Sequence, residues 1–144
     1  MSEKSTSMPG SAPTRQPAPR VLLAEDNPIS RRLVIEYLTH KGFSVTGAAD
    51  GEDALAQLRS TPPDVLILDI QMPRLDGFAV LNAIRADTDP RVRAIPVIAL
   101  TAMAMQGDEA MCMAAGANAY CSKPVRLHKL SGLVQWLLDK VTRC

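Results

Sequence analysis

The stretch Asp64-Val-Leu-Ile-Leu-Asp69-Ile-Gln-Met-Pro73 decides the fold class of this chain. Four consecutive apolar residues, Val65 to Leu68, lead directly into the carboxylate of Asp69, and Pro73 ends the run. An apolar run without alternation is typical of a strand that is buried on both faces of a parallel sheet. The stretch therefore predicts a central strand with Asp69 at its carboxyl end, where α/β proteins usually bind ligands.

Strands and helices are predicted to alternate along the rest of the chain. Apolar runs predict the other strands, at Arg20–Glu25, Phe43–Ala48, Ile95–Leu100 and Ala119–Ser122. Capping residues and helical spacing predict five helices, which begin at Asn27-Pro28, Asp50, Asp76-Gly77, about Gln106 and about Arg126. The segment Asp87–Pro90 is predicted to be a loop. This alternation predicts an α/β fold with a doubly wound, five-stranded parallel sheet, and the flavodoxin-like order 2-1-3-4-5 makes its first and third strands neighbours.

Length and composition fit one domain. The chain has 144 residues, 47% of them hydrophobic, and a formal charge of +1, which favours neither nucleic acid nor a membrane surface as a partner. Residues 1–19 are rich in Ser, Pro, Thr and Gln and are predicted to form a disordered tail, with one domain over residues 20–144. Three cysteines without metal-ligand spacing, and no recognisable secretory or membrane segment, lead us to expect a cytoplasmic protein.

Reactive side chains gather at the carboxyl ends of the predicted strands. Glu25 and Asp26 end the first strand, Asp69 ends the third, and Thr101 and Lys123 follow the fourth and fifth. Carboxylates brought together in this way repel one another, and Mg²⁺ would relieve that repulsion. An aspartate can act as a nucleophile toward a phosphoryl group, while Mg²⁺ and the lysine ammonium compensate the charge of the transferred oxygens. The threonine hydroxyl can donate a hydrogen bond to the same group.

These residues, with Met72-Pro73, Asp76-Gly77, Thr101-Ala102 and Lys123-Pro124, resemble the motifs of the response-regulator receiver domain of two-component signalling. The resemblance covers roughly residues 20 to 141 and is greatest to receivers of hybrid kinases and phosphorelays. It implies that Asp69 is the phospho-acceptor. It also implies a phosphohistidine donor, which is either a histidine kinase or a histidine phosphotransfer protein.

The resemblance also implies a magnesium site. Its protein ligands would be Glu25, Asp26, Asp69 and the backbone carbonyl of Gln71. Glu25 stands where the family more often has an aspartate, so direct ligation and ligation through a water both stay open. Gln71 lies at a position that varies in the family and that tunes the rate of phosphoryl hydrolysis.

Further roles follow from the same resemblance. Lys123, Thr101 and Ala102 would bind the phosphoryl group, Tyr120 would be the aromatic switch residue, and the bond before Pro124 would be cis. We expect no output domain, so phosphorylation would change a surface on the fourth of the five predicted helices, the fifth strand and the last helix. A downstream protein would bind this surface, without direct nucleic-acid binding or turnover of an external substrate. The protein would be a monomer or a weak, phosphorylation-dependent dimer.

Two other functions use similar elements. A phosphatase with an aspartate nucleophile often has a second acid two residues after the nucleophile, but Gln71 stands there. A flavodoxin-like FMN-binding protein needs a phosphate loop rich in Ser, Thr and Gly after the first strand, where this chain has the acidic Glu25-Asp26 pair. Methionines 103, 105, 111 and 113 are predicted to fill the core and the helix rather than to form a docking surface.

Overall fold

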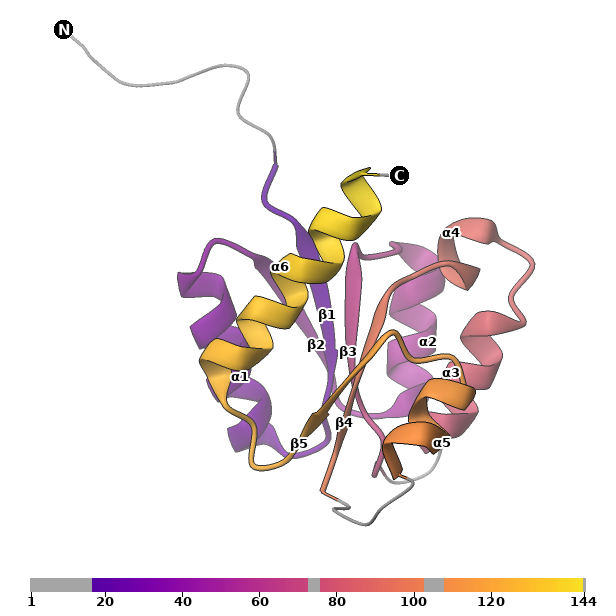
Figure 1. Ribbon diagram of the computed structural model, residues 1–144, viewed down its shortest axis with the longest axis horizontal. Coiled ribbons are helices and arrows are strands. Elements are labelled where there is room, and N and C mark those ends of the chain that lie inside the picture. Colours follow the sequence, from indigo (N-terminus) through magenta and orange to yellow (C-terminus); the bar gives the residue numbers. More distant parts are fainter. Residues whose placement is uncertain (1–16, 73–75, 103–107, 144) are drawn as a thin grey trace, which may run out of the picture.

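The computed structural model describes residues 17–72, 76–102 and 108–143, without the side chains of residues 108 and 141–143. A five-stranded parallel sheet of order β2-β1-β3-β4-β5 lies between two layers of helices (Figure 1). The predicted doubly wound fold is therefore confirmed. The predicted tail lies outside the described residues as far as residue 16.

The elements follow one another as predicted, with one addition. The strands are β1 (Arg20–Ala24), β2 (Ser44–Ala48), β3 (Val65–Asp69), β4 (Val97–Thr101) and β5 (Ala119–Ser122). The helices are α1 (Pro28–His40), α2 (Gly51–Ser60), α3 (Gly77–Arg85), α4 (Pro90–Arg93), α5 (Asp108–Ala114) and α6 (Leu127–Arg143). The predicted fourth helix is thus α5, and the predicted last helix is α6.

Helix α4 is the addition, and it corrects the prediction of a loop that reached Pro90. The Asp89 carboxylate accepts a hydrogen bond of 2.9 Å from the backbone N–H of Arg91, and Pro90 stands at the first helical position. This is the same Asx-Pro start that opens α1. With only four residues, α4 shows no apolar periodicity that could reveal it in the sequence.

Each face of the sheet has its own hydrophobic core. Helices α2, α3 and α5 cover one face, and α1 and α6 cover the other (Figure 1). Leu66 and Leu68 of β3 pack into the first core, whereas Val65 and Ile67 pack into the second. This alternation buries the whole strand, which explains why its apolar run is continuous.

Side-chain caps start three helices at the edge of the sheet where the strands end. The Asn27 side-chain oxygen accepts hydrogen bonds from the backbone N–H groups of Ile29 and Ser30, at 2.9 and 3.0 Å. Asp50 and Asp76 cap α2 and α3 in the same way. The caps satisfy backbone donors that have no partner within the helix, and they fix each helix start close to a strand end.

The apolar residues of α1 do not all face the core. Val34 and Leu38 are buried, but Ile29 is 79% exposed and Leu33 is 54% exposed. The two exposed residues lie in the first half of the helix, which begins directly after the acidic end of β1. Helix α1 therefore presents an apolar patch to solvent beside the edge where the strands end.

Arg85, at the end of α3, connects three segments at the opposite edge of the sheet. Its guanidinium donates to the backbone carbonyls of Arg93, Ile95 and Gly116 and to the side chain of Asn118, at 2.7 to 3.0 Å. These acceptors belong to the ends of α4 and α5 and to the start of β4 and β5. Arg85 thus anchors the carboxyl end of α5 to the rest of the fold.

Candidate functional site

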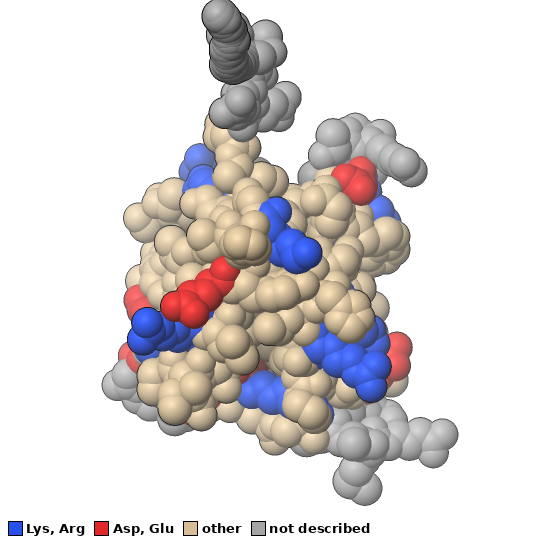
Figure 2. All heavy atoms as spheres, turned by 90° about the vertical axis from the view of Figure 1, so that its left-hand side faces the viewer, with Lys and Arg blue, Asp and Glu red and all other residues tan. Residues whose placement is uncertain are grey.

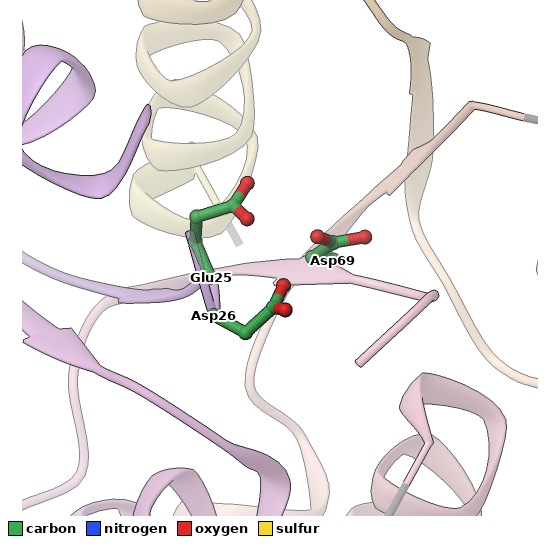
Figure 3. A group of neighbouring side chains, drawn as sticks. All are labelled: Glu25, Asp26 and Asp69. Carbon is green, nitrogen blue, oxygen red and sulfur yellow. The ribbon is translucent and has the colours of Figure 1, made fainter. Parts of the chain in front are cut away.

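Three carboxylates from two adjacent strands meet at the carboxyl edge of the sheet. Glu25 and Asp26 follow β1, Asp69 ends β3, and one oxygen of each lies within 4.8 Å of the others (Figure 3). Glu25 is 3% exposed and Asp69 is 1% exposed, whereas Asp26 is exposed to solvent. The parallel pairing of β1 with β3 brings these residues together, as the predicted strand order requires.

Lys123 places a cation between the two buried carboxylates. Its Nζ lies 2.7 Å from Oδ2 of Asp69 and 3.2 Å from Oε1 of Glu25. Lys123 follows β5, so its long side chain crosses above the end of β4 to reach β3. The peptide bond between Lys123 and Pro124 is cis.

The pKa values of this group reflect burial and close charges. Burial raises the pKa of Glu25 above its ordinary value of 4.5, and the charge of Asp69 raises it further. The hydrogen bond from the backbone N–H of Asn27 and the ammonium of Lys123 lower the pKa, but they do not outweigh these effects. For Lys123, burial lowers the pKa, but the hydrogen bond and charge of Asp69 and the charge of Glu25 outweigh it, so the pKa is raised above 10.5. The lysine is therefore a cation at neutral pH.

Two contacts that the sequence does not reveal hold Glu25 in place. The backbone N–H of Asn27 donates to Oε2 of Glu25 at 3.1 Å, and Nη1 of Arg31 donates to the Glu25 carbonyl at 2.9 Å. Asn27 thus supports the acidic pair with its backbone while its side chain caps α1. No sequence signal identifies Arg31, because its acceptor is a backbone carbonyl.

Gln71 links the loop after β3 to the end of β4. Its backbone N–H donates to Oδ1 of Asp69 at 3.0 Å. Its side-chain oxygen accepts from the backbone N–H of Ala102 at 3.1 Å. The sequence suggested a role for the carbonyl of Gln71, but gave no sign that its side chain reaches Ala102.

Gly77 fixes the course of the chain after Asp69. Its N–H donates to the carbonyl of Ile70 at 2.9 Å, and a Cβ atom built on Gly77 would lie 2.5 Å from Cα of Ile70. Any larger residue would push the start of α3 away from the loop. The Asp76-Gly77 motif therefore serves packing as well as capping.

Thr101 and Tyr120 lie on the other face of the sheet from the lysine. Thr101 is buried at the end of β4, and Tyr120 is half-buried against the core formed with α2, α3 and α5. Residue 99 pairs with 120 and residue 101 pairs with 122, so strand alternation directs Thr101 and Tyr120 to the same side. The structure thus gathers the other predicted site residues around one edge, while Tyr120 lies inside β5, two residues before the position that pairs with Thr101.

The three carboxylates suit a hard cation. Mg²⁺ prefers oxygen ligands, uses one or two carboxylates and keeps several waters. Here two buried carboxylates and one exposed carboxylate offer oxygens to a shared space, and the exposed Asp26 leaves room for water. The donor set therefore fits magnesium.

None of the helices in the described residues is long and apolar enough to cross a bilayer.

Residues 21–135 match the sequence model of the response regulator receiver domain. The chain is 36% identical over 105 residues to the polar-differentiation response regulator DivK of Brucella anthropi, which covers 73% of this chain and 84% of that protein. It is 35% identical over 124 residues to the probable transcriptional regulator ycf27 of Guillardia theta, which covers 86% of this chain and 47% of that protein.

A solved structure shares the fold and about a third of the aligned residues. The receiver domain of the sensor histidine kinase PA1611 from Pseudomonas aeruginosa has a magnesium ion coordinated in its active site cleft. It is similar to this chain with a TM-score of 0.77 and 35% identity, over 85% of this chain and 98% of that domain. The chain spans about half the length of the ycf27 relative, so that similarity concerns the receiver part alone. With its fold, its acidic edge and the family match over 115 residues in agreement, the chain belongs to the response regulator receiver family of two-component and phosphorelay signalling.

Proposed function

We propose that Asp69 is the phospho-acceptor of this receiver and that it takes its phosphoryl group from a phosphohistidine. The surroundings of the Asp69 carboxylate support this proposal most strongly. Asp69 is 1% exposed, lies 2.7 Å from the Lys123 ammonium, and shares the edge of the sheet with two further carboxylates. A structural ion pair would need no such excess of negative charge, whereas phosphoryl transfer with a divalent cation does.

In the transfer step, a carboxylate oxygen of Asp69 forms a bond to phosphorus while the P–N bond of phosphohistidine breaks. The leaving imidazole nitrogen keeps the electron pair of that bond. Oδ1 of Asp69 accepts from the N–H of Gln71 and Oδ2 accepts from Lys123, which orients the carboxylate before the donor arrives. The product is an aspartyl phosphate, with no change in the number of protons on Asp69.

The surrounding residues stabilise the transferred group. Lys123 exchanges part of its contact with Asp69 for a phosphoryl oxygen, and the Thr101 hydroxyl and Ala102 N–H donate to the others. Magnesium, bound by Glu25, Asp26, Asp69 and the carbonyl of Gln71, would supply charge compensation for the phosphoryl oxygens. We expect the receiver to act only on its own carboxylate.

The donor reaches Asp69 over α1. A groove of about 240 Å³ is lined by Leu33 and Val34 of α1 together with Glu25 and Lys123, so it joins the apolar patch of α1 to the acceptor site. Ile29 and Leu33 are exposed beside it. A protein that carries phosphohistidine on a helix with an apolar stripe would cover this patch while it presents the histidine to Asp69.

The phosphorylated state changes the surface on α5, β5 and α6. Thr101 and Tyr120 lie on the same side of the sheet, so movement of Thr101 toward a phosphoryl group opens space next to Tyr120. Inward rotation of Tyr120 would then alter the exposed side of β5. We propose that a downstream protein binds this surface, that residues 20–144 carry the whole switch, and that the protein works in the cytoplasm.

Phosphoramidate, a small donor with a P–N bond, tests the chemistry without a partner protein. We expect the chain to gain the mass of one phosphoryl group when Mg²⁺ is present, and to gain none when EDTA is present or when Asp69 is replaced by Asn. Asp76→Asn is a matched control, because Asp76 is an exposed cap of α3 outside the carboxylate cluster. Equal labelling with and without Mg²⁺ would contradict the proposal.

A further inference from the structure

One side of α6 combines the tryptophan of the chain with two lysines. Lys129, Leu133, Trp136 and Lys140 are spaced at i, i+4, i+7 and i+11, so they follow one another along the same side of the helix, over about 16 Å. Trp136 is 49% exposed. Nζ of Lys140 lies 4.6 Å from the centroid of its ring. An exposed indole flanked by cations is a feature that folding alone does not require.

This side of α6 begins at a hollow beside the edge strand β5. The hollow has a volume of about 260 Å³ and is lined by Cys121, Ser122, Pro124, Arg126 and Lys129. Its lining contains two cationic side chains and no carboxylate. Among the residues that the structure describes, neither Arg126 nor Lys129 has an ion-pair partner. An anion that entered the hollow would therefore meet two unneutralised cations.

The rest of the surface around α6 and α5 indicates that a partner would also carry apolar side chains. The only carboxylate of α6, Asp139, accepts a hydrogen bond of 3.0 Å from Gln135 on another side of the helix. Across β5, Met111 is 56% exposed and Met113 is 42% exposed, so these two methionines lie in helix α5 as predicted but not in the core. Met103 and Met105 lie outside the described residues. The surface thus has an apolar, adaptable flank on α5 and a cationic, aromatic flank on α6.

We propose that the cationic stripe, formed by Arg126, Lys129, Trp136 and Lys140, docks an acidic segment of a protein partner. A carboxylate of the segment enters the hollow between Arg126 and Lys129, and an apolar side chain covers the indole of Trp136. The inference rests on the proposed function, because it names the class of partner for the surface on α5, β5 and α6. The recognition chemistry is charge complementarity around an aromatic anchor.

A protein fits this stripe better than a nucleic acid does. The formal charge of the chain is only +1, and on the face shown in Figure 2 the Lys and Arg side chains form separate groups rather than one continuous field. Nucleic-acid binding depends on many phosphate contacts along such a field. Exposed Trp, Met and Arg side chains are instead typical of protein interfaces.

Trp136 provides the measurement, because it is the only tryptophan in the chain. The full chain is titrated with a synthetic peptide of Glu and Leu at helical spacing, with and without phosphoramidate and Mg²⁺, while the fluorescence of Trp136 is recorded. We expect a saturable change, tighter in the phosphorylated protein. Lys129→Gln and Arg126→Gln should each weaken binding about fivefold, whereas Lys41→Gln, a change at an exposed lysine after α1, should not.

Three further probes separate the alternatives. A peptide with Lys in place of Glu, and one with Ser in place of Leu, should both bind more weakly than the acidic, apolar peptide. Equal binding of the basic peptide, or unchanged binding in both Arg126→Gln and Lys129→Gln, would overturn the inference. Tighter binding of a short DNA duplex than of the acidic peptide would assign the stripe to nucleic acid and overturn it as well.

The phosphorylation state of Asp69, measured by mass in the same samples, separates this inference from the proposed function. Labelled Asp69 without peptide binding would reject the cationic stripe and leave the acceptor assignment intact. Charge-dependent binding without any labelling would reject the acceptor assignment and keep the stripe as a docking surface.

Discussion

Nζ of Lys123 lies 2.7 Å from Oδ2 of Asp69, closer than it lies to Glu25, and the three side chains lie at the ends of three different strands. Lys123 is thus the nearer partner of the Asp69 carboxylate. Under the proposed function, this ion pair holds Asp69 in place and keeps a cation where the negative charge of the phosphoryl group would develop.

Replacing Lys123 by Met removes this cation. We expect the rate of labelling by phosphoramidate to fall about 100-fold, because a preorganised charge at the transferred group is lost. The free energy of unfolding without Mg²⁺ should fall by about 2 kcal/mol, since two buried carboxylates lose their partner, with a discount because the lysine side chain is 27% exposed. Mass spectrometry and urea denaturation measure the two effects. Lys41→Met is the control, and an unchanged labelling rate in Lys123→Met would remove Lys123 from the site.

Magnesium should stabilise the folded protein, because it relieves the repulsion among Glu25, Asp26 and Asp69. At a Mg²⁺ concentration of ten times Kd, we expect about 1.4 kcal/mol of stabilisation, which thermal denaturation detects as a higher Tm. Asp26→Asn should lose most of this effect, while Asp76→Asn should keep it. If the Tm of the wild-type chain is the same with and without Mg²⁺, that result would contradict a metal site at these residues.

The same stabilisation should depend on pH. The pKa of Glu25 is raised above 4.5, so its proton competes with the metal at a higher pH than for an ordinary glutamate. The shift in Tm caused by Mg²⁺ is therefore present above the raised pKa of Glu25 and lost as the pH falls through it. In Glu25→Gln the pH dependence at this point should disappear, and its persistence would show that another group controls metal binding.

Gln71→Ala should speed up phosphorylation. The side-chain oxygen of Gln71 accepts from the N–H of Ala102 at 3.1 Å, and that donor has to leave Gln71 before it can bind a phosphoryl oxygen. Loss of one competing hydrogen bond of about 1 kcal/mol corresponds to about a fivefold faster rate. Rapid-quench labelling with phosphoramidate measures this rate. Gln57→Ala, which removes the hydrogen bond from Gln57 of α2 to the backbone carbonyl of Gly47 in β2, is the matched control. A slower reaction in Gln71→Ala would mean that the glutamine assists the transfer.

Charged substitutions on the apolar patch of α1 should separate donor docking from chemistry. In Ile29→Asp and Leu33→Asp, we expect the free energy of unfolding to change by no more than about 0.5 kcal/mol, because both side chains are exposed. Labelling by phosphoramidate should stay at the wild-type rate, while transfer from a phosphorylated histidine phosphotransfer protein should fall at least about tenfold.

Met113→Asp supplies the control for this pair, because Met113 is an exposed apolar residue on α5, away from the acceptor site. It should leave transfer from the phosphotransfer protein unchanged. If all three variants lose transfer equally, the patch on α1 has no special part in docking.

The sequence was sufficient for the sheet and for the residues at its edge. The unbroken apolar run before Asp69 identified a doubly covered strand, and the Asn27-Pro28 cap located the start of α1. Because the connections are short and the strands parallel, every strand end had to appear at the same edge. This is why Glu25, Asp69 and Lys123 could be grouped before their distances were known.

The remaining features depend on contacts between distant parts of the chain. Arg85 has four acceptors on the ends of other elements, three of them backbone carbonyls, and no residue type in the sequence marks those positions. The sequence could not predict that Ile29 and Leu33 are exposed. Helical spacing shows which apolar residues share one side of a helix, but it does not show how much of that side the sheet covers. The hydrogen bond from Ala102 to Gln71 depends on the exact path of two loops.

The acceptor assignment is tested most directly by locating the phosphoryl group. The wild-type chain is labelled with phosphoramidate and Mg²⁺ and reduced with borohydride, which converts an aspartyl phosphate to homoserine, and the modified residue is identified by peptide mass spectrometry. We expect homoserine at position 69, and none without Mg²⁺. Modification at position 25 or 26 instead, or labelling that survives Asp69→Asn at the wild-type rate, would contradict it.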